Sequence, residues 1–130
     1  MERFFWICAA GAAGTAARYL VAGWAARRLG SAFPYGTLIV NLAGCYLIAA
    51  VMQGALSLGW SPTVRAAVTI GFLGGFTTYS SFNYETMRLF EEGATASAAL
   101  NVAGTLLGGL LAGWLGLLTA REVLGRAGGL

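Results

Sequence analysis

Long apolar stretches separated by short polar turns are the feature of this sequence that most constrains its fold. Because a helix rises about 1.5 Å per residue, about 20 apolar residues cross the roughly 30 Å hydrocarbon core of a bilayer. Four stretches approach or exceed that length, at residues 4–24, 36–57, 65–90 and 96–119. Charged residues make up only 10% of the chain, against about 25% in an average soluble domain. The sequence therefore predicts an all-α membrane protein, residues 1–130 forming a single four-helix transmembrane domain.

The residue types that are missing exclude several kinds of chemistry. The sequence contains no His, no Lys and no Asp. Ser-His-Asp catalysis, imidazole metal sites and Schiff-base lysines cannot be built without them, so we do not expect an enzyme. The net charge of +3 comes from scattered arginines, which does not favour nucleic-acid binding. Cys8 and Cys45 lie in apolar stretches and are expected to be packing residues.

The third stretch is more polar than the other three. It carries Gly71, Gly74 and Gly75, followed directly by the polar run at residues 77–81. Glycine costs about 1 kcal/mol relative to alanine in a helix interior. Non-helical backbone at membrane depth survives only where it is buried in protein or lines water. We therefore expect a helix that is broken near residues 74–80, whose freed backbone groups are available to ions.

The arginines divide evenly between the two sides of a four-span chain. Arg3, Arg65, Arg121 and Arg126 fall on the side of both termini, and Arg18, Arg27, Arg28 and Arg88 fall on the other. Orientation normally follows an excess of Arg and Lys in cytoplasmic loops, so an even division predicts insertion in both orientations. A single orientation set by the Arg27–Arg28 pair is the alternative. Because four helices barely enclose a core, we expect an antiparallel homodimer in which two broken third helices meet at the midplane.

Uncharged polar side chains recur on the second and fourth stretches. Thr37 and Asn41 are four residues apart and share one helix face. Asn101 and Thr105 have the same spacing. Each such residue can simply join two helices, at about 0.6 kcal/mol per hydrogen bond. Together with the expected break, the set favours a path for a small uncharged or anionic solute, because a cation pathway would prefer a ring of carboxylates.

Aromatic and ionisable residues occur within the same spans. Tyr79 and Phe82 directly follow the expected break, and the positive edges of their rings can approach an anion, although spaced aromatics are more often packing residues. Glu85 is the only acid inside a span, which makes it a functional hypothesis, but near a helix end it can also reach the headgroups. Arg18 can likewise attract anions or extend to the interface.

Three motifs resemble those of the Fluc/CrcB fluoride channel family. They are Gly11-xx-Gly14-xxx-Arg18-Tyr19, Pro34-x-Gly36-Thr37-Leu38-x-Val40-Asn41-xx-Gly44, and Gly71-xx-Gly74-Gly75-Phe76-Thr77-Thr78-Tyr79-Ser80-Ser81-Phe82. The resemblance covers all four spans in order. It implies an antiparallel, dual-topology homodimer in the cell (inner or plasma) membrane, with two pores. Such a channel exports cytoplasmic fluoride passively, and its presence gives resistance to the ion.

The resemblance also implies roles for individual residues. Asn41 is expected to hydrogen-bond fluoride, and the ring edges of Tyr79 and Phe82 to face it. The backbone carbonyls of Gly74 and Thr77, contributed by both subunits, are expected to hold a structural Na⁺ ion at the dimer interface. The implied fluoride pathway consists of Asn41, Thr37, Tyr79, Phe82, Thr105 and Ser81, with Arg18 and Glu85 in the vestibule.

This sequence departs from the family pattern at several positions. Tyr79 stands where the family usually has Phe, so its hydroxyl adds a hydrogen-bond donor, and Ser81 stands where Thr is common. Asn101 and Gly109 occupy a fourth-helix stripe where other members can carry Tyr and Ser.

Two other functions are compatible with a small four-span chain. A small multidrug-resistance type exporter is also a dual-topology dimer, but it uses a carboxylate within the first span, where this chain has Arg18. A non-transporting membrane assembly protein would use motifs such as Gly104-xxx-Gly108 only to pack helices closely. Fluoride efflux from liposomes separates the channel from both.

Overall fold

The computed structural model describes residues 1–127 and is all-α over that range, with no strand. Four helices are α1 (Glu2–Leu29), α2 (Tyr35–Ser57), α5 (Tyr79–Glu91) and α6 (Thr95–Ala127). Between α2 and α5 lies a continuous helical segment made of α3 (Pro62–Ala66), the π-helix η1 (Ala67–Leu73) and α4 (Gly74–Phe76). Within the described residues, α1, α2 and α6 are long and apolar enough to cross a membrane.

The third predicted span is built from two shorter helical pieces, the α3–η1–α4 segment and α5. The interruption is confined to Thr77 and Thr78, whereas the sequence suggested residues 74–80. Gly74 and Gly75 are both helical, and the absence of a side chain at Gly75 lets the segment lie close to α1. A methyl group at Gly75, for example, would overlap the Gly11 carbonyl oxygen. This close packing offsets the cost of glycine in a helix.

The two threonines explain where the helix stops and restarts. Thr77 and Thr78 have extended backbones, with ψ of 159° and 115°. Branched side chains favour that conformation, and hydroxyls compete for backbone partners. Thr77 Oγ1 donates to the Leu73 carbonyl at 3.0 Å, and Thr78 Oγ1 accepts from the Ser81 N–H at 3.3 Å as the N-cap of α5. A side-chain cap of this kind contributes about 1 kcal/mol.

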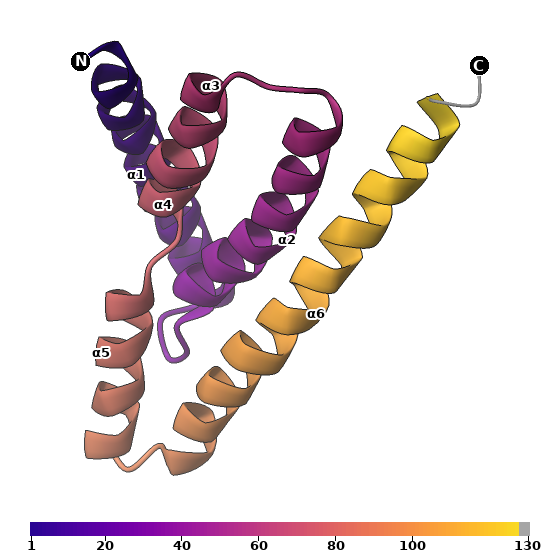
Figure 1. Ribbon diagram of the computed structural model, residues 1–130. Coiled ribbons are helices and arrows are strands. Elements are labelled where there is room, and N and C mark those ends of the chain that lie inside the picture. Colours follow the sequence, from indigo (N-terminus) through magenta and orange to yellow (C-terminus); the bar gives the residue numbers. More distant parts are fainter. Residues whose placement is uncertain (128–130) are drawn as a thin grey trace.

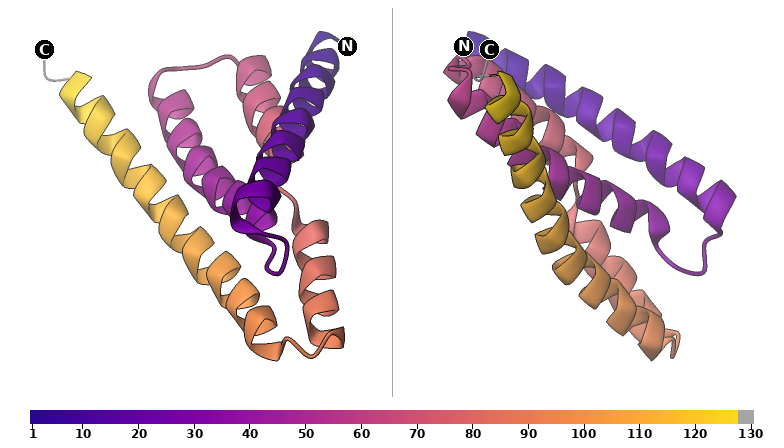
Figure 2. Two further views of the ribbon diagram at one scale, coloured as in Figure 1. Left: turned by 180° about the vertical axis from the view of Figure 1, so that it is seen from behind. Right: turned by 90° about the vertical axis from the view of Figure 1, so that its right-hand side faces the viewer.

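The helices form two packed groups that share α2 (Figure 1). On one side, α1 lies along η1 and α4 and also contacts α2. On the other side, α6 runs along α2 and reaches α5 at its lower end. Figure 2 shows that the start of α1, the α2–α3 connection and the end of α6 lie toward one end of the molecule. The chain turns between α1 and α2 and between α5 and α6 lie toward the other.

Close contacts at glycines hold both groups together. A methyl group at Gly71 would lie 2.6 Å from the Ile7 carbonyl oxygen, so η1 and α1 touch through their backbones. On α6, a methyl group at Gly108 would lie 3.0 Å from Leu42 Cδ2 of α2. Small residues on such faces let membrane helices approach each other, as the glycine spacing of the fourth stretch indicates.

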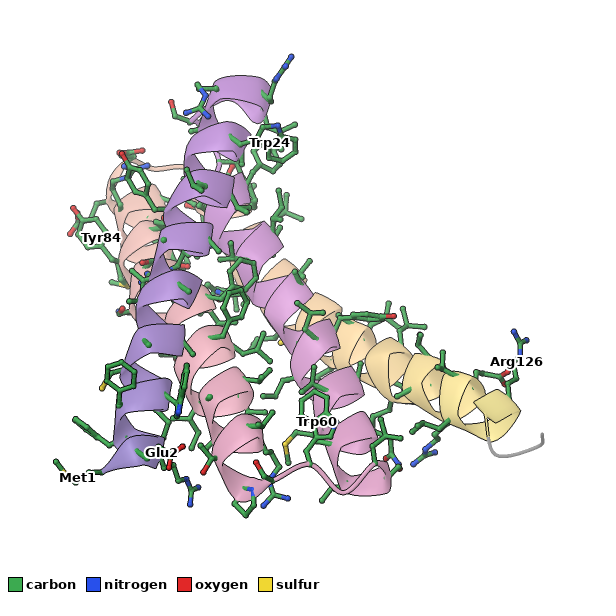
Figure 3. The ribbon with its side chains drawn as sticks, turned by 90° about the horizontal axis from the view of Figure 1, so that it is seen from above. Met1, Glu2, Trp24, Trp60, Tyr84 and Arg126 are labelled. Carbon is green, nitrogen blue, oxygen red and sulfur yellow. The ribbon has the colours of Figure 1, made fainter. Side chains whose placement is uncertain are left out.

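Large apolar side chains cover the outside of the molecule. Leu110 is 75% exposed, and Tyr84 and Trp24 point away from the neighbouring helices (Figure 3). The fully buried side chains are few, and one of them, Asn101, is polar. A surface this apolar is suited to lipid, and the exposed segments are helices, whose backbone groups are satisfied internally.

Candidate functional site

The helix interruption is held by the side chain of Asn41 on α2. Asn41 Nδ2 donates to the Thr78 carbonyl at 3.0 Å, and the Thr78 N–H donates to Asn41 Oδ1 at 2.8 Å. In a continuous helix the Thr78 N–H would bond to the Gly74 carbonyl four residues earlier. The Asn41 side chain therefore supplies the hydrogen bonds that the Thr78 N–H and carbonyl would make within a continuous helix.

A second polar side chain reaches the interruption from α1. Arg18 Nε donates to the Gly75 carbonyl at 3.0 Å, so the guanidinium completes the open end of the α3–η1–α4 segment. A cation at a helix C-terminus is favourable because the free carbonyls carry partial negative charge. Arg18 thus brings a positive charge to the broken helix, and neither ion pair in residues 1–127 involves it.

Two cavities lie on either side of the Asn41–Thr78 pair. The larger, of about 550 Å³, brings together the predicted pathway residues Asn41, Tyr79 and Thr105. The smaller, of about 320 Å³, lies between α1, α2 and α5. Thr78 lines both. The remaining predicted residues of the smaller cavity are Arg18, Thr37, Ser81 and Glu85.

Thr37 and Glu85 form a pair within the smaller cavity. Thr37 Oγ1 donates to Glu85 Oε1 at 2.8 Å across 48 residues of sequence. The other carboxylate oxygen, Oε2, is buried without a partner in the part of the chain that the structure describes. An unpaired buried acceptor is costly, which makes Glu85 a place where a water molecule or a proton donor is needed. A third cavity continues past Glu85 toward Arg88.

Phe82 lines neither of the two main cavities, although the sequence places it on the fluoride pathway. Its side chain is only 6% exposed, and its ring centre lies 5.6 Å from that of Tyr79. Tyr79 is 76% exposed in the single chain. The structure therefore brings the two rings together but leaves one inside the protomer and the other on its surface.

Thr105 is the fourth-helix residue of the larger cavity. Its hydroxyl is buried and has no hydrogen-bond partner among residues 1–127. A hydroxyl that faces a cavity in this state is available to a solute or to water. Asn101, one turn earlier, lines neither main cavity and is fully buried against α5.

The backbone carbonyls predicted to hold Na⁺ also border the larger cavity. Gly74 and Thr77 both line it. The usual helical donor for the Gly74 carbonyl, the Thr78 N–H, is taken by Asn41. The Thr77 carbonyl receives no hydrogen bond within residues 1–127. Carbonyl oxygens suit hard cations, so the chemistry of this donor set fits Na⁺.

The central part that Thr78 plays is not predicted from the sequence. This residue pairs with Asn41, caps α5 and lines both cavities. The sequence does contain a signal for the cap. Thr78 and Ser81 have the spacing of an N-cap residue and the residue whose N–H donates to its side chain. The Asn41–Thr78 pairing itself leaves no trace in the sequence.

Comparison with known proteins places the chain in a family. Residues 5–117 match the family model described as "CrcB-like protein, Camphor Resistance (CrcB)". A relative from Sorangium cellulosum (strain So ce56), named "Fluoride-specific ion channel FluC", is 50% identical over 95% of this chain and 98% of its own length. A relative of the same name from Geobacter metallireducens is 49% identical over 87% of this chain and 92% of its own. A third, from Geobacter sulfurreducens, is 47% identical over the same shares. By this evidence the chain belongs to the CrcB family.

Proposed function

We propose that this chain forms a fluoride-selective ion channel that exports cytoplasmic fluoride passively, down its electrochemical gradient, and so gives resistance to fluoride. The observation that carries the proposal is its 50% identity to a protein named a fluoride-specific ion channel, over nearly the full length of both chains. The named relatives are ion channels and not enzymes. The geometry around the broken helix supplies a physical basis for anion passage.

Neutral donors and one cation surround the interruption. Fluoride is a small anion that holds its water strongly, so a path must replace that water with hydrogen-bond donors. Asn41 Nδ2 retains a second N–H beyond the one it gives to Thr78, and Thr105 carries a hydroxyl without a partner. Arg18 raises the local concentration of anions, because apolar walls focus the electric field of a charge in a cleft. Tyr79 and Phe82 add ring edges.

We further propose that the working unit is an antiparallel homodimer with dual topology. The larger cavity opens on the surface of a single chain, so a second copy is needed to enclose a path there. The arginines support two orientations, because Arg3 and Arg65 lie toward one end of the molecule and Arg27 and Arg88 toward the other. Two chains would contribute four carbonyls from Gly74 and Thr77 to one Na⁺ ion, which would add charge and rigidity at the interface.

Fluoride efflux from proteoliposomes tests the function. A fluoride electrode is expected to record rapid release from vesicles that contain the protein, without a proton gradient, while chloride efflux stays near that of empty vesicles. An exporter of the multidrug-resistance type would instead need a proton gradient and a cationic substrate. Absence of fluoride release from a folded dimer contradicts the proposal.

Labelling from the two sides of the membrane tests the dual topology. In a variant with Cys8 and Cys45 replaced by Ala, Ser31→Cys adds one thiol to the exposed α1–α2 turn. A membrane-impermeant maleimide is expected to label about half of the molecules from outside, since the arginine division favours neither orientation. Labelling of all or of none from outside contradicts dual insertion.

A further inference from the structure

A buried hydrogen-bonded chain links α6 to the backbone of Phe82. Asn101 Nδ2 donates to Thr86 Oγ1 at 2.9 Å, and Thr86 Oγ1 donates to the Phe82 carbonyl at 2.7 Å. Asn101 is 0% exposed and Thr86 is 6% exposed. Within residues 1–127 the bond from Asn101 to Thr86 is the only side-chain hydrogen bond between α5 and α6. α5 and α6 also pack against each other directly.

The direction of both bonds follows from the chemistry of the groups. A carbonyl oxygen only accepts, so the single hydroxyl proton of Thr86 is committed to Phe82. Thr86 Oγ1 must then accept from its second neighbour, which identifies the amide nitrogen of Asn101 as the contacting atom. Each bond polarises the next, so a change at either side chain is felt at the Phe82 carbonyl.

We propose that Asn101 and Thr86 are positioning residues that set the rotation of α5 against α6 and thereby the place of the Phe82 ring beside the fluoride path. The proposal rests on the channel function above. In a helix, the few allowed side-chain rotamers tie the position of a ring to the helix that carries it. The Phe82 ring is enclosed by protein, so a rotation of α5 carries the edge of the ring with it.

This role differs from the one suggested by the sequence, in which Asn101 lies on the polar stripe of the fourth helix. Asn101 borders neither main cavity, and one of its two N–H groups is given to Thr86. It therefore acts on the ion through Phe82 and does not touch it. If the bond merely holds two helices together, its loss would reduce the number of folded channels and leave the rate of each unchanged.

Efflux at low protein density separates these two roles. When most vesicles contain one channel or none, the released fraction counts active channels and the time constant gives their rate. Thr86→Val keeps the shape of the side chain and removes the hydroxyl, and Asn101→Leu removes the donor. The matched control is Thr119→Val, because Thr119 also donates to a carbonyl four residues earlier but lies exposed on α6.

We expect Thr86→Val and Asn101→Leu each to slow fluoride efflux about tenfold, the effect of one lost hydrogen bond. Thr86→Ser restores the hydroxyl and is expected to stay close to the wild-type rate, as is Thr119→Val. The double variant should be no slower than either single one, because both changes break the same chain. If an apolar variant does not fold, Thr86→Cys, which retains a weak donor, is expected to conduct slowly in its place.

The possible outcomes are distinct. Wild-type protein without fluoride efflux overturns the channel function and with it this proposal. Wild-type conduction together with unchanged rates in the folded variants overturns the positioning role alone, even if fewer vesicles are active.

A fluorinated phenylalanine incorporated at position 82 adds a direct probe. Its ¹⁹F resonance in the detergent-solubilised dimer is expected to shift in Thr86→Val and Asn101→Leu but not in Thr119→Val, and an unchanged resonance in all three contradicts the proposal.

Discussion

Asn41 and Thr78 lie 37 residues apart and exchange two hydrogen bonds, so that one amide side chain satisfies both backbone groups of a residue in the broken helix. In a membrane there is no water to take over such groups. The same side chain was predicted to bind fluoride, and that role stays a prediction. The structure adds that Asn41 also bonds to both backbone groups of Thr78 at the interruption.

Replacing Asn41 is therefore expected to affect folding as well as conduction. Asn41→Leu leaves the N–H and the carbonyl of Thr78 without partners, and each buried unsatisfied group costs about 1–3 kcal/mol. We expect a lower melting temperature in detergent and little fluoride efflux. Asn83→Leu, at an exposed position on α5, is the control. Normal thermal stability of Asn41→Leu would show that the pair contributes little.

Loss of an aromatic edge is expected to slow conduction without affecting assembly. Phe82→Ile keeps an apolar side chain at a site that is 6% exposed but removes the ring. An aromatic contact is worth about 0.5–1.5 kcal/mol, so fluoride efflux should fall by about two- to tenfold. Gel filtration should still give a dimer. Phe90→Ile changes a ring that is 45% exposed on the same helix and should conduct normally. Equal rates for the two variants would exclude a role for the Phe82 ring.

The charge and the hydrogen bond of Arg18 can be separated by two substitutions. Arg18→Lys keeps the positive charge but lacks the guanidinium fork that bonds to the Gly75 carbonyl, and Arg18→Gln loses the charge. We expect efflux to decrease in the order wild type, Lys, Gln, by about tenfold overall. Arg126→Gln, at an exposed site near the end of α6, should match the wild type. An Arg18→Gln rate equal to that of the wild type would remove Arg18 from the vestibule.

One glycine of α2 is expected to tolerate no side chain. A methyl group at Gly44 would overlap Thr77 Cγ2 at the interruption, and excess volume in a packed site costs about 1–3 kcal/mol. Gly44→Ala should reduce both thermal stability and fluoride efflux, because it displaces the residue that ends the α3–η1–α4 segment. Gly54→Ala on the same helix meets open space and should be neutral or slightly stabilising. If both variants behave alike, this packing does not position the interruption.

Much of the fold can be predicted because its signals are local. Apolar length places α1, α2 and α6, and the glycines followed by hydroxyls indicate a broken third span. The exact interruption was missed because glycine permits either a helix or a break, and close contact of Gly75 with α1 keeps the helix intact there. Thr77 and Thr78 break it instead, through extended backbones and hydroxyl bonds that a composition pattern does not specify.

The sequence by itself determined which side chains are available within the spans: apolar side chains for lipid, neutral hydrogen-bond donors, three arginines and one carboxylate. Only the tertiary structure decided how they combine. Thr37 pairs with Glu85, Arg18 with the Gly75 carbonyl, and Asn101 with Thr86. These contacts join different helices, so they depend on how each helix is rotated and how closely glycine lets it approach its neighbour. A residue's spacing along its own helix defines its face, and the packing of the other helices decides what that face meets.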